Sequence, residues 1–280
     1  MKLYKSGREL QKQIVETKIG DQSVGFWNLG QAGYLFKMEH ASFVIDPYLS
    51  DWVFELVGNP WVRKFAPPIQ PADLPEVDFV LCTHHHEDHM DKRSLTEIHS
   101  HTQRTKFIVP RAHVDIVKQW GLSEERIIGI SHGETLQQGA VKIEAFKAMH
   151  DQFEQDEAGE HKFLGYVLQV GDIVLYHAGD TLIFTELVQW LQDKQVDIAL
   201  IPINGRDLQR TEMGIVGNCN YRDAADLAVA IQADLMVPIH FGLFPHNDEN
   251  PAYFVDYLYS RYPAQKFHML TAGERFVYMK

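Results

Sequence analysis

The stretch Val77-Asp78-Phe79-Val80-Leu81-Cys82-Thr83-His84-His85-His86-Glu87-Asp88-His89 decides the fold of this 280-residue chain. Residues 77–82 form a short apolar run that predicts a buried strand. Four histidines and two carboxylates follow at once, in residues 84–89. Imidazole nitrogens and carboxylate oxygens are ligands that suit zinc, manganese or iron. Because the cluster is internal and follows an apolar run, we predict a metal site at a strand end rather than a solvated histidine turn.

The spacing of the motif allows two ions to be held. His84 and His86 can close on one ion, and Asp88 and His89 on a second ion in the same turn. Two ions about 3.5–4 Å apart need a bridging anionic ligand and further histidines. Three more candidates each follow directly on a strand-like run, where a sheet fixes the backbone and a loop frees the side chain. These are His150, Asp180 and His240.

The order of elements along the chain predicts an α/β fold. Strand-like runs come first, strands and helices then alternate, and no linker rich in Gly, Ser or Pro divides the chain, so residues 1–280 are expected to form one domain. Residues 1–20 are predicted to be an N-terminal arm, helical or loose. Residues 51–75 contain five prolines and several aromatic residues. We expect there a long loop or subdomain near the site, without regular elements, that either covers core or forms a lid or wall.

Composition restricts the partners. The 38 acidic residues exceed the 26 basic ones, giving a net charge of −12, and 45% of the residues are hydrophobic. This acidic excess argues against nucleic acids and anionic membrane surfaces as partners. The two cysteines are far apart, and neither a secretory leader nor a long apolar run is recognised, which favours the cytoplasm. We expect a small-molecule substrate, phosphorylated or not, and leave a homo-oligomer open.

The motif at residues 84–89, together with His150, Gly179-Asp180-Thr181 and His240, resembles the metallo-β-lactamase superfamily, whose ligands occur in this order. The resemblance implies a four-layer αβ/βα sandwich with a dinuclear metal site at one edge of two packed sheets. It also implies how the ligands divide: His84, His86 and His150 on the first ion, Asp88, His89 and His240 on the second, and Asp180 between them. Zinc or manganese is expected, with iron as a further candidate.

Further segments point to one branch of that superfamily. Residues 27–33, His89-Met90-Asp91 and the segment from Met213-Gly214 to Asn220 resemble the L-ascorbate-6-phosphate lactonase-like group. This resemblance implies a hydrolase that opens a sugar-acid lactone such as L-ascorbate 6-phosphate. A hydroxide activated between two divalent ions would be the nucleophile. Asp88 is the predicted catalytic residue, which orients the nucleophile and takes its proton.

Loops near the ligands supply candidates for substrate binding: Asn204, Arg206, Asn218, His177 and His246. Arg206 has the geometry to pair a phosphate or carboxylate, or it is a surface arginine paired with Asp207 or Asp223. Asn218 and its neighbours either bind sugar hydroxyls or cap the helix that follows, and we expect one of them to be a cap. The two histidines are candidates for proton transfer or for positioning.

The same metal site is compatible with other functions. A phosphodiesterase or ribonuclease is one alternative, although the net charge and the lack of a basic run oppose it. A thioesterase similar to glyoxalase II is another. An iron-dependent redox enzyme and a non-catalytic metal-binding protein complete the alternatives. The complete set of candidate ligands argues against the last of these.

Overall fold

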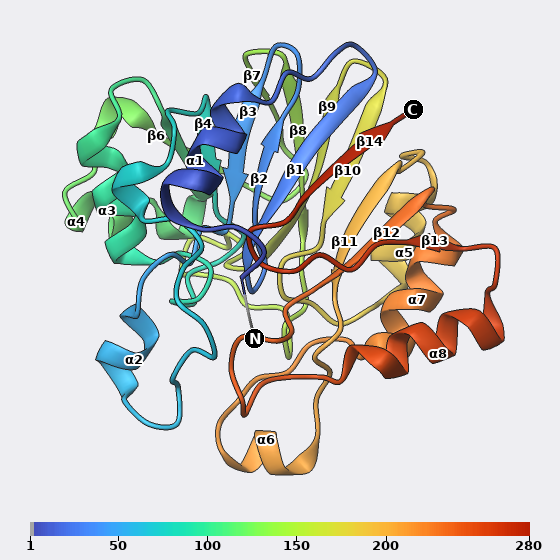
Figure 1. Ribbon diagram of the computed structural model, residues 1–280. Helices are drawn as coiled ribbons and strands as arrows, with labels where there is room; N and C mark the ends of the chain where they lie inside the picture. Colours follow the sequence, from blue (N-terminus) through green and yellow to red (C-terminus); the bar gives the residue numbers. More distant parts are fainter. Residues whose placement is uncertain (1–2) are drawn as a thin grey trace.

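The computed structural model describes residues 3–280, so the first two residues of the predicted N-terminal arm lie outside the described residues. Two seven-stranded sheets pack face to face, with helices on their outer sides (Figure 1). The strand order is β14-β1-β2-β3-β4-β5-β6 in the first sheet and β13-β12-β11-β10-β9-β8-β7 in the second. The chain completes most of the first sheet before it begins the second, and returns to the first only with β14.

The first sheet changes from antiparallel to parallel at β3. Its β14, β1, β2 and β3 pair antiparallel, and β3, β4, β5 and β6 pair parallel. Strands β1 and β2 form an antiparallel hairpin, with residues 31 and 32 at its turn. The strands are β1 (Ser23–Gly30), β2 (Gly33–Lys37), β3 (Ser42–Ile45), β4 (Phe79–Leu81), β5 (Lys106–Pro110), β6 (Ile127–Ile130) and β14 (Arg275–Met279).

The second sheet repeats this plan. Its β7 to β10 form an antiparallel meander, and β10 to β13 pair parallel. The carboxyl ends of its parallel strands therefore lie at one edge of the sheet, as they do in the first sheet. The strands are β7 (Thr135–Gln138), β8 (Val141–Lys147), β9 (Leu164–Val170), β10 (Ile173–His177), β11 (Ile198–Pro202), β12 (Leu235–Ile239) and β13 (Lys266–Phe267).

Helices cover the outer face of each sheet. Buried residues of α1 (Gly7–Glu16), α3 (Lys92–His101) and α4 (Val114–Gln119) pack in one hydrophobic cluster with the first sheet. Those of α5 (Thr185–Gln192), α7 (Tyr221–Ala230) and α8 (Pro251–Arg261) pack with the second. The implied four-layer αβ/βα sandwich is confirmed. Single 3₁₀ turns occur at Pro71–Asp73, Arg111–His113 and Glu124–Arg126.

The core between the sheets is aromatic on the side of the first sheet. Phe43 stacks on Phe36 and on Phe79, with ring centroids 5.1 and 4.9 Å apart. Residues from both sheets belong to this cluster, including Ile143 of β8 and Tyr166 of β9. In β8 alternate residues are buried, because successive side chains of a strand point to opposite faces. This core fixes the two sheets whose edges carry the candidate ligands.

Two short helices stand outside the layers at one end of the molecule, α2 (Trp52–Val57) and α6 (Leu208–Glu212) (Figure 1). The prediction that residues 51–75 lack regular elements is wrong at α2. The prolines of this segment begin at Pro60, so they leave residues 52–57 free to form a helical turn and a half. Among the described residues, none of the helices has the length and apolar character needed to span a bilayer.

Candidate metal centre

All seven predicted ligands gather at one edge of the two sheets. The strands position four of them: His84 follows β4, and His150, Asp180 and His240 follow β8, β10 and β12. The other three, His86, Asp88 and His89, lie on the turn that leads from β4 into α3. Asp91 caps α3, because its side chain accepts a hydrogen bond from the Arg93 amide. The turn is therefore fixed at both of its ends.

Asp180 lies between the histidines. Its Oδ1 is 3.2 Å from His89 Nε2, and its Oδ2 is 3.2 Å from His240 Nε2 and 3.7 Å from His150 Nε2. Asp88 Oδ2 is 3.4 Å from His240 Nε2. Three groups have ligand atoms within 4.8 Å of one another: His84, His89 and Asp180; His86, His150 and Asp180; Asp88, His89 and His240.

The polar atoms of this cluster fit metal ions. His84 Nε2, His89 Nε2 and Asp180 Oδ1 are buried and have no hydrogen-bond partner among residues 3–280. A buried polar group without a partner costs about 1–3 kcal/mol. Three such atoms that face one another are satisfied by a cation, and a set of imidazole and carboxylate ligands suits zinc, manganese or iron.

The tautomers of two ligands follow from their neighbours. Asp46 accepts hydrogen bonds from the amide and hydroxyl of Thr83, at 2.8 and 2.7 Å, and from His89 Nδ1 at 2.8 Å. Because the Thr83 hydroxyl gives its one proton to Asp46, His84 Nδ1 must donate to the same hydroxyl, 2.9 Å away. Both rings therefore carry a proton on Nδ1 and turn Nε2 toward the centre, which is the orientation that a metal ligand needs.

The carboxylates attract positive charge to the centre. Burial by itself lowers the pKa of His240, but the Asp180 carboxylate and hydrogen bonds to Asp180 and Asp88 outweigh it and raise that pKa to about 9. Burial lowers the pKa of His150 to about 4, although Asp180 opposes this shift. Burial would raise the pKa of Asp180, but the neighbouring His240 and His89 hold it well below its usual range. The carboxylates are therefore ionised at neutral pH.

Gln31, in the turn between β1 and β2, contacts the centre directly. Its Nε2 donates to Asp88 Oδ2 at 2.8 Å and lies 3.1 Å from His240 Nε2. Its Oε1 is buried without a partner among the described residues. Gln31, Asp46 and His240 all have positive φ, at 55°, 46° and 60°. Non-glycine residues seldom adopt this conformation, and it tends to occur at functional sites. All three residues lie in or next to the centre: Gln31 contacts Asp88 and His240, and Asp46 contacts His89.

Gly179 brings the Asp180 turn close to the strand end that carries His84. A Cβ atom at Gly179 would lie 2.8 Å from the Cβ of Thr83, and the residue has a φ of +60°. Both the space and the backbone conformation therefore require glycine next to Asp180.

Replacing Asp46 with alanine is expected to weaken metal binding by about 10- to 100-fold, because His89 loses the carboxylate that orients its ring. Competition with a chromogenic chelator measures this affinity. The matched control is Asp197→Ala, which removes a buried carboxylate that accepts the Val174 amide far from the centre. An equal loss of metal affinity in both variants would contradict a specific role for Asp46.

The cavity over the centre has a volume of about 300 Å³. Five of the predicted ligands line it, namely His86, Asp88, His150, Asp180 and His240, together with Glu87 and Asn247. The rest of its lining is one glycine and apolar side chains from α2, from the loop that follows α2, from the segment after α6 and from residue 244. The apolar residues are Val53, Val57, Trp61, Met213, Ile215, Val216 and Phe244.

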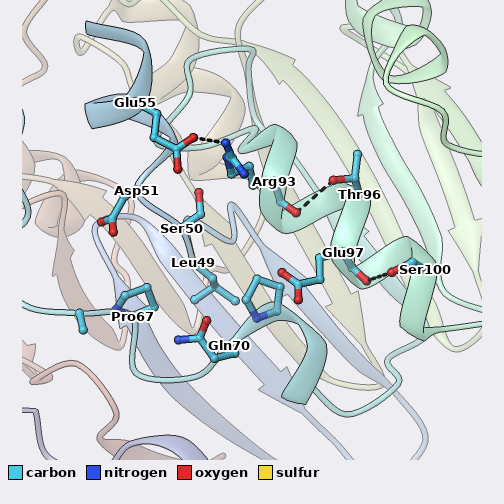
Figure 2. Close-up of a pocket in the computed structure, with 12 residues that line it drawn as sticks. Leu49, Ser50, Asp51, Glu55, Pro67, Gln70, Arg93, Thr96, Glu97 and Ser100 are labelled. Atoms are coloured by element: carbon cyan, nitrogen blue, oxygen red, sulfur yellow. Dashed lines mark hydrogen bonds and ion pairs between the residues drawn. The ribbon is translucent and has the colours of Figure 1, made fainter. Parts of the chain in front are cut away.

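A larger hollow of about 640 Å³ lies between α2 and α3 (Figure 2). Its charged lining consists of Asp51, Glu55, Glu97 and Arg93. Figure 2 shows Glu55 and Arg93 pointing toward each other, and the two form an ion pair. None of the seven predicted ligands lines this hollow, so the smaller cavity is the one that has access to the metal centre.

None of the five predicted substrate residues is among the described residues that line the 300 Å³ cavity over the centre. Asn204 and Asn218 are buried and hydrogen-bond to each other, and Asn204 also donates to Asn247. The His177 ring is buried and bonds the carbonyl of Ala32. The remaining two, Arg206 and His246, are exposed.

Two of the structural alternatives can be decided. Arg206 is a surface arginine, but its partner is Asp151 at 3.0 Å. The pairing with Asp207 or Asp223 is wrong, because Asp207 pairs with Arg210 and caps α6. The helix cap expected in the asparagine run is Asn220, whose side chain accepts from the amides of Arg222 and Asp223.

Fold and centre together define a metallo-hydrolase of the αβ/βα sandwich type. Residues 42–241 match the family described as the beta-lactamase superfamily domain, and the chain belongs to this superfamily of metal-dependent hydrolases. It is 30% identical to a UPF0173 metal-dependent hydrolase of Nitratidesulfovibrio vulgaris, with 88% of this chain and 91% of the relative covered.

Two further similarities are more distant. The chain is 22% identical to a probable L-ascorbate-6-phosphate lactonase of Escherichia fergusonii, over 88% of this chain and 77% of that protein. Among solved structures, Igni18, a metallo-hydrolase of the archaeon Ignicoccus hospitalis, superposes with a TM-score of 0.71 and 21% identity. The superposition covers 92% of this chain and 99% of the other. This structural similarity supports the assignment of the fold.

Asp46 and Gln31 belong to the centre but were not predicted from the sequence. The available signals were Asp46-Pro47 directly after a strand and Gln31 within the segment that resembles the lactonase-like group. Neither signal indicates a metal centre by itself, since both residues are far in sequence from the histidine motif.

Proposed function

We propose that the chain hydrolyses a lactone with two divalent ions, zinc or manganese, held by the seven side chains of the centre. His84, His86 and His150 would hold one ion, Asp88, His89 and His240 the other, and Asp180 would lie between them. The observation that carries this proposal is the set of unpartnered Nε2 and Oδ1 atoms turned toward one another. The two buried, unpaired cysteines favour the cytoplasm as the compartment.

When bound, such ions lower the pKa of a water between them toward neutrality and polarise a carbonyl oxygen. The residues of the chain have separate tasks. Asp88 lies at the cavity wall and is held by Gln31, so its carboxylate can orient the attacking water and accept its proton. His89 Nδ1 stays protonated toward Asp46. The apolar side chains of the cavity would shield a bound substrate from bulk water.

The reaction is a ring opening. The water oxygen forms a bond to the lactone carbonyl carbon, and the ring bond between that carbon and the ring oxygen breaks. One proton of the water passes to the Asp88 carboxylate and from there to the departing alkoxide. The product is a hydroxy acid, and no oxidant or reductant is needed. L-Ascorbate 6-phosphate is the substrate that the distant lactonase relative suggests, and it belongs in the test.

The test combines metal analysis with a substrate panel. Untagged protein loaded with zinc or manganese is expected to hold close to two ions per chain and to hydrolyse a lactone faster than a thioester or a phosphodiester. Asp88→Ala is expected to lower lactone turnover by about 10²- to 10⁴-fold. Asp193→Ala, an exposed carboxylate at the end of α5, is the control. Faster hydrolysis of the phosphodiester or the thioester would contradict the lactone proposal and support a phosphodiesterase or a thioesterase instead.

A further inference from the structure

We infer that the substrate carries an apolar arm, which lies between α2 and residues 213–216 while its carbonyl faces the metal centre. The inference rests on the proposed function and names the class of substrate for it: an uncharged lactone with an alkyl chain rather than a phosphorylated sugar acid. Helices α2 and α6 both stand at this end of the molecule (Figure 1), and residues of α2 and of the segment after α6 line one cavity.

The two sides of the cavity are apolar. Val57 and Trp61 come from the α2 segment, and Met213, Ile215 and Val216 from the loop after α6. Phe244 packs edge-on against Trp61, with ring centroids 5.3 Å apart. These side chains line the same cavity as five of the predicted ligands and range from buried Phe244 to exposed Val57, so an arm attached to a bound carbonyl would contact them.

The apolar side chains at the mouth of the cavity are exposed. Val57 is 59% exposed, Met213 46% and Val216 41%. Each therefore has apolar surface to remove from water when a ligand is bound, and gathered exposed apolar side chains are typical of binding sites. Because these side chains line the same cavity as the metal ligands, we expect a part of the substrate to bind against them.

The charges of the lining oppose an anionic arm. No lysine or arginine lines the cavity within residues 3–280, whereas Glu87 does. Arg206, the candidate for a phosphate, pairs with Asp151 outside the lining. A phosphate between α2 and residues 213–216 would lose water without gaining a cation from these side chains.

Side chains of α2 that face away from the cavity bind α2 to α3. Val53 and Val57 are four residues apart and so share a face of the helix, which is turned to the cavity. On another face Glu55 forms the ion pair with Arg93, in the hollow of Figure 2. Trp52 lies 5.5 Å from the same guanidinium. A preformed wall reduces the entropy cost of binding an arm.

The experiment compares three lactones on metal-loaded protein: γ-butyrolactone, γ-decalactone with its hexyl arm, and L-ascorbate 6-phosphate. Each methylene removed from water contributes roughly fourfold to kcat/KM. With part of the arm buried, the ratio of kcat/KM for γ-decalactone to kcat/KM for γ-butyrolactone is expected to be at least about 10. Val57→Asp and Val216→Asp are expected to lower this ratio by about 10-fold. Leu56→Asp, which changes another exposed residue of α2 outside the lining, is expected to leave this ratio unchanged.

A binding assay separates this inference from the proposed function. Tryptophan fluorescence with 1-octanol, which has no carbonyl, is expected to change in the wild-type protein and not in Trp61→Phe. Octanol binding without lactone hydrolysis would overturn the lactonase and support the apolar arm. Faster turnover of L-ascorbate 6-phosphate than of γ-decalactone would overturn the arm alone. Binding to phosphatidylcholine vesicles through Val57, without a chain-length effect on hydrolysis, would also overturn it.

Discussion

Asp180→Ala is expected to lose most of the bound metal and to reduce kcat/KM by at least about 10³-fold. Its two carboxylate oxygens lie 3.2 Å from His89 Nε2 and His240 Nε2, so it contacts both halves of the centre. Ions held in such a site contribute several kcal/mol to transition-state stabilisation, and about 4 kcal/mol corresponds to three orders of magnitude in rate. Metal analysis and hydrolysis of the best lactone measure the two effects.

Asp180→Asn separates charge from shape. Asparagine keeps the size of the side chain but lacks the negative charge that raises the pKa of His240. We expect this variant to remain folded by circular dichroism and to lose metal in the same way as Asp180→Ala. Asp193→Ala controls for removal of a carboxylate elsewhere. Metal content near that of the wild type in both Asp180 variants would refute the central position of this carboxylate.

Phe43→Ala is expected to lower the free energy of unfolding by about 3–5 kcal/mol. Phe43 is fully buried and stacks on Phe36 and Phe79, so truncation removes a ring from the middle of a continuous aromatic row. The surrounding sheet is fixed by its hydrogen bonds and cannot collapse to fill the cavity. Urea unfolding of the metal-free proteins measures the change without a contribution from metal binding.

The matched control is Phe54→Ala on α2, where the phenylalanine is 41% exposed. A surface substitution of this kind is expected to change the free energy of unfolding by about 0.5 kcal/mol or less. A destabilisation below about 1.5 kcal/mol for Phe43→Ala would indicate that the row of rings is not packed as described.

The candidate metal centre was predictable from the sequence to an unusual degree, because four of its seven residues follow strands and the other three lie in the histidine motif. His84, His150, Asp180 and His240 are found at strand ends by pattern alone, and strand ends meet at sheet edges. The ligand roles assigned by resemblance stay proposals, although the structure places all seven side chains together. The prediction for residues 51–75 failed at α2, since the proline content of the whole segment concealed a proline-free stretch at its beginning.

The sequence by itself determined the class of fold and the chemistry of the ligands, since apolar periodicity and residue type are local properties of the chain. Only the tertiary structure decided that Asp46 orients His89 and that Gln31 holds Asp88, because these contacts join residues 43 and 57 positions apart. It also decided which side chains line the cavity. Val57 and Val216 line the same cavity because the two sheets bring their loops to the same edge. This proximity cannot be inferred from the local sequence around either residue.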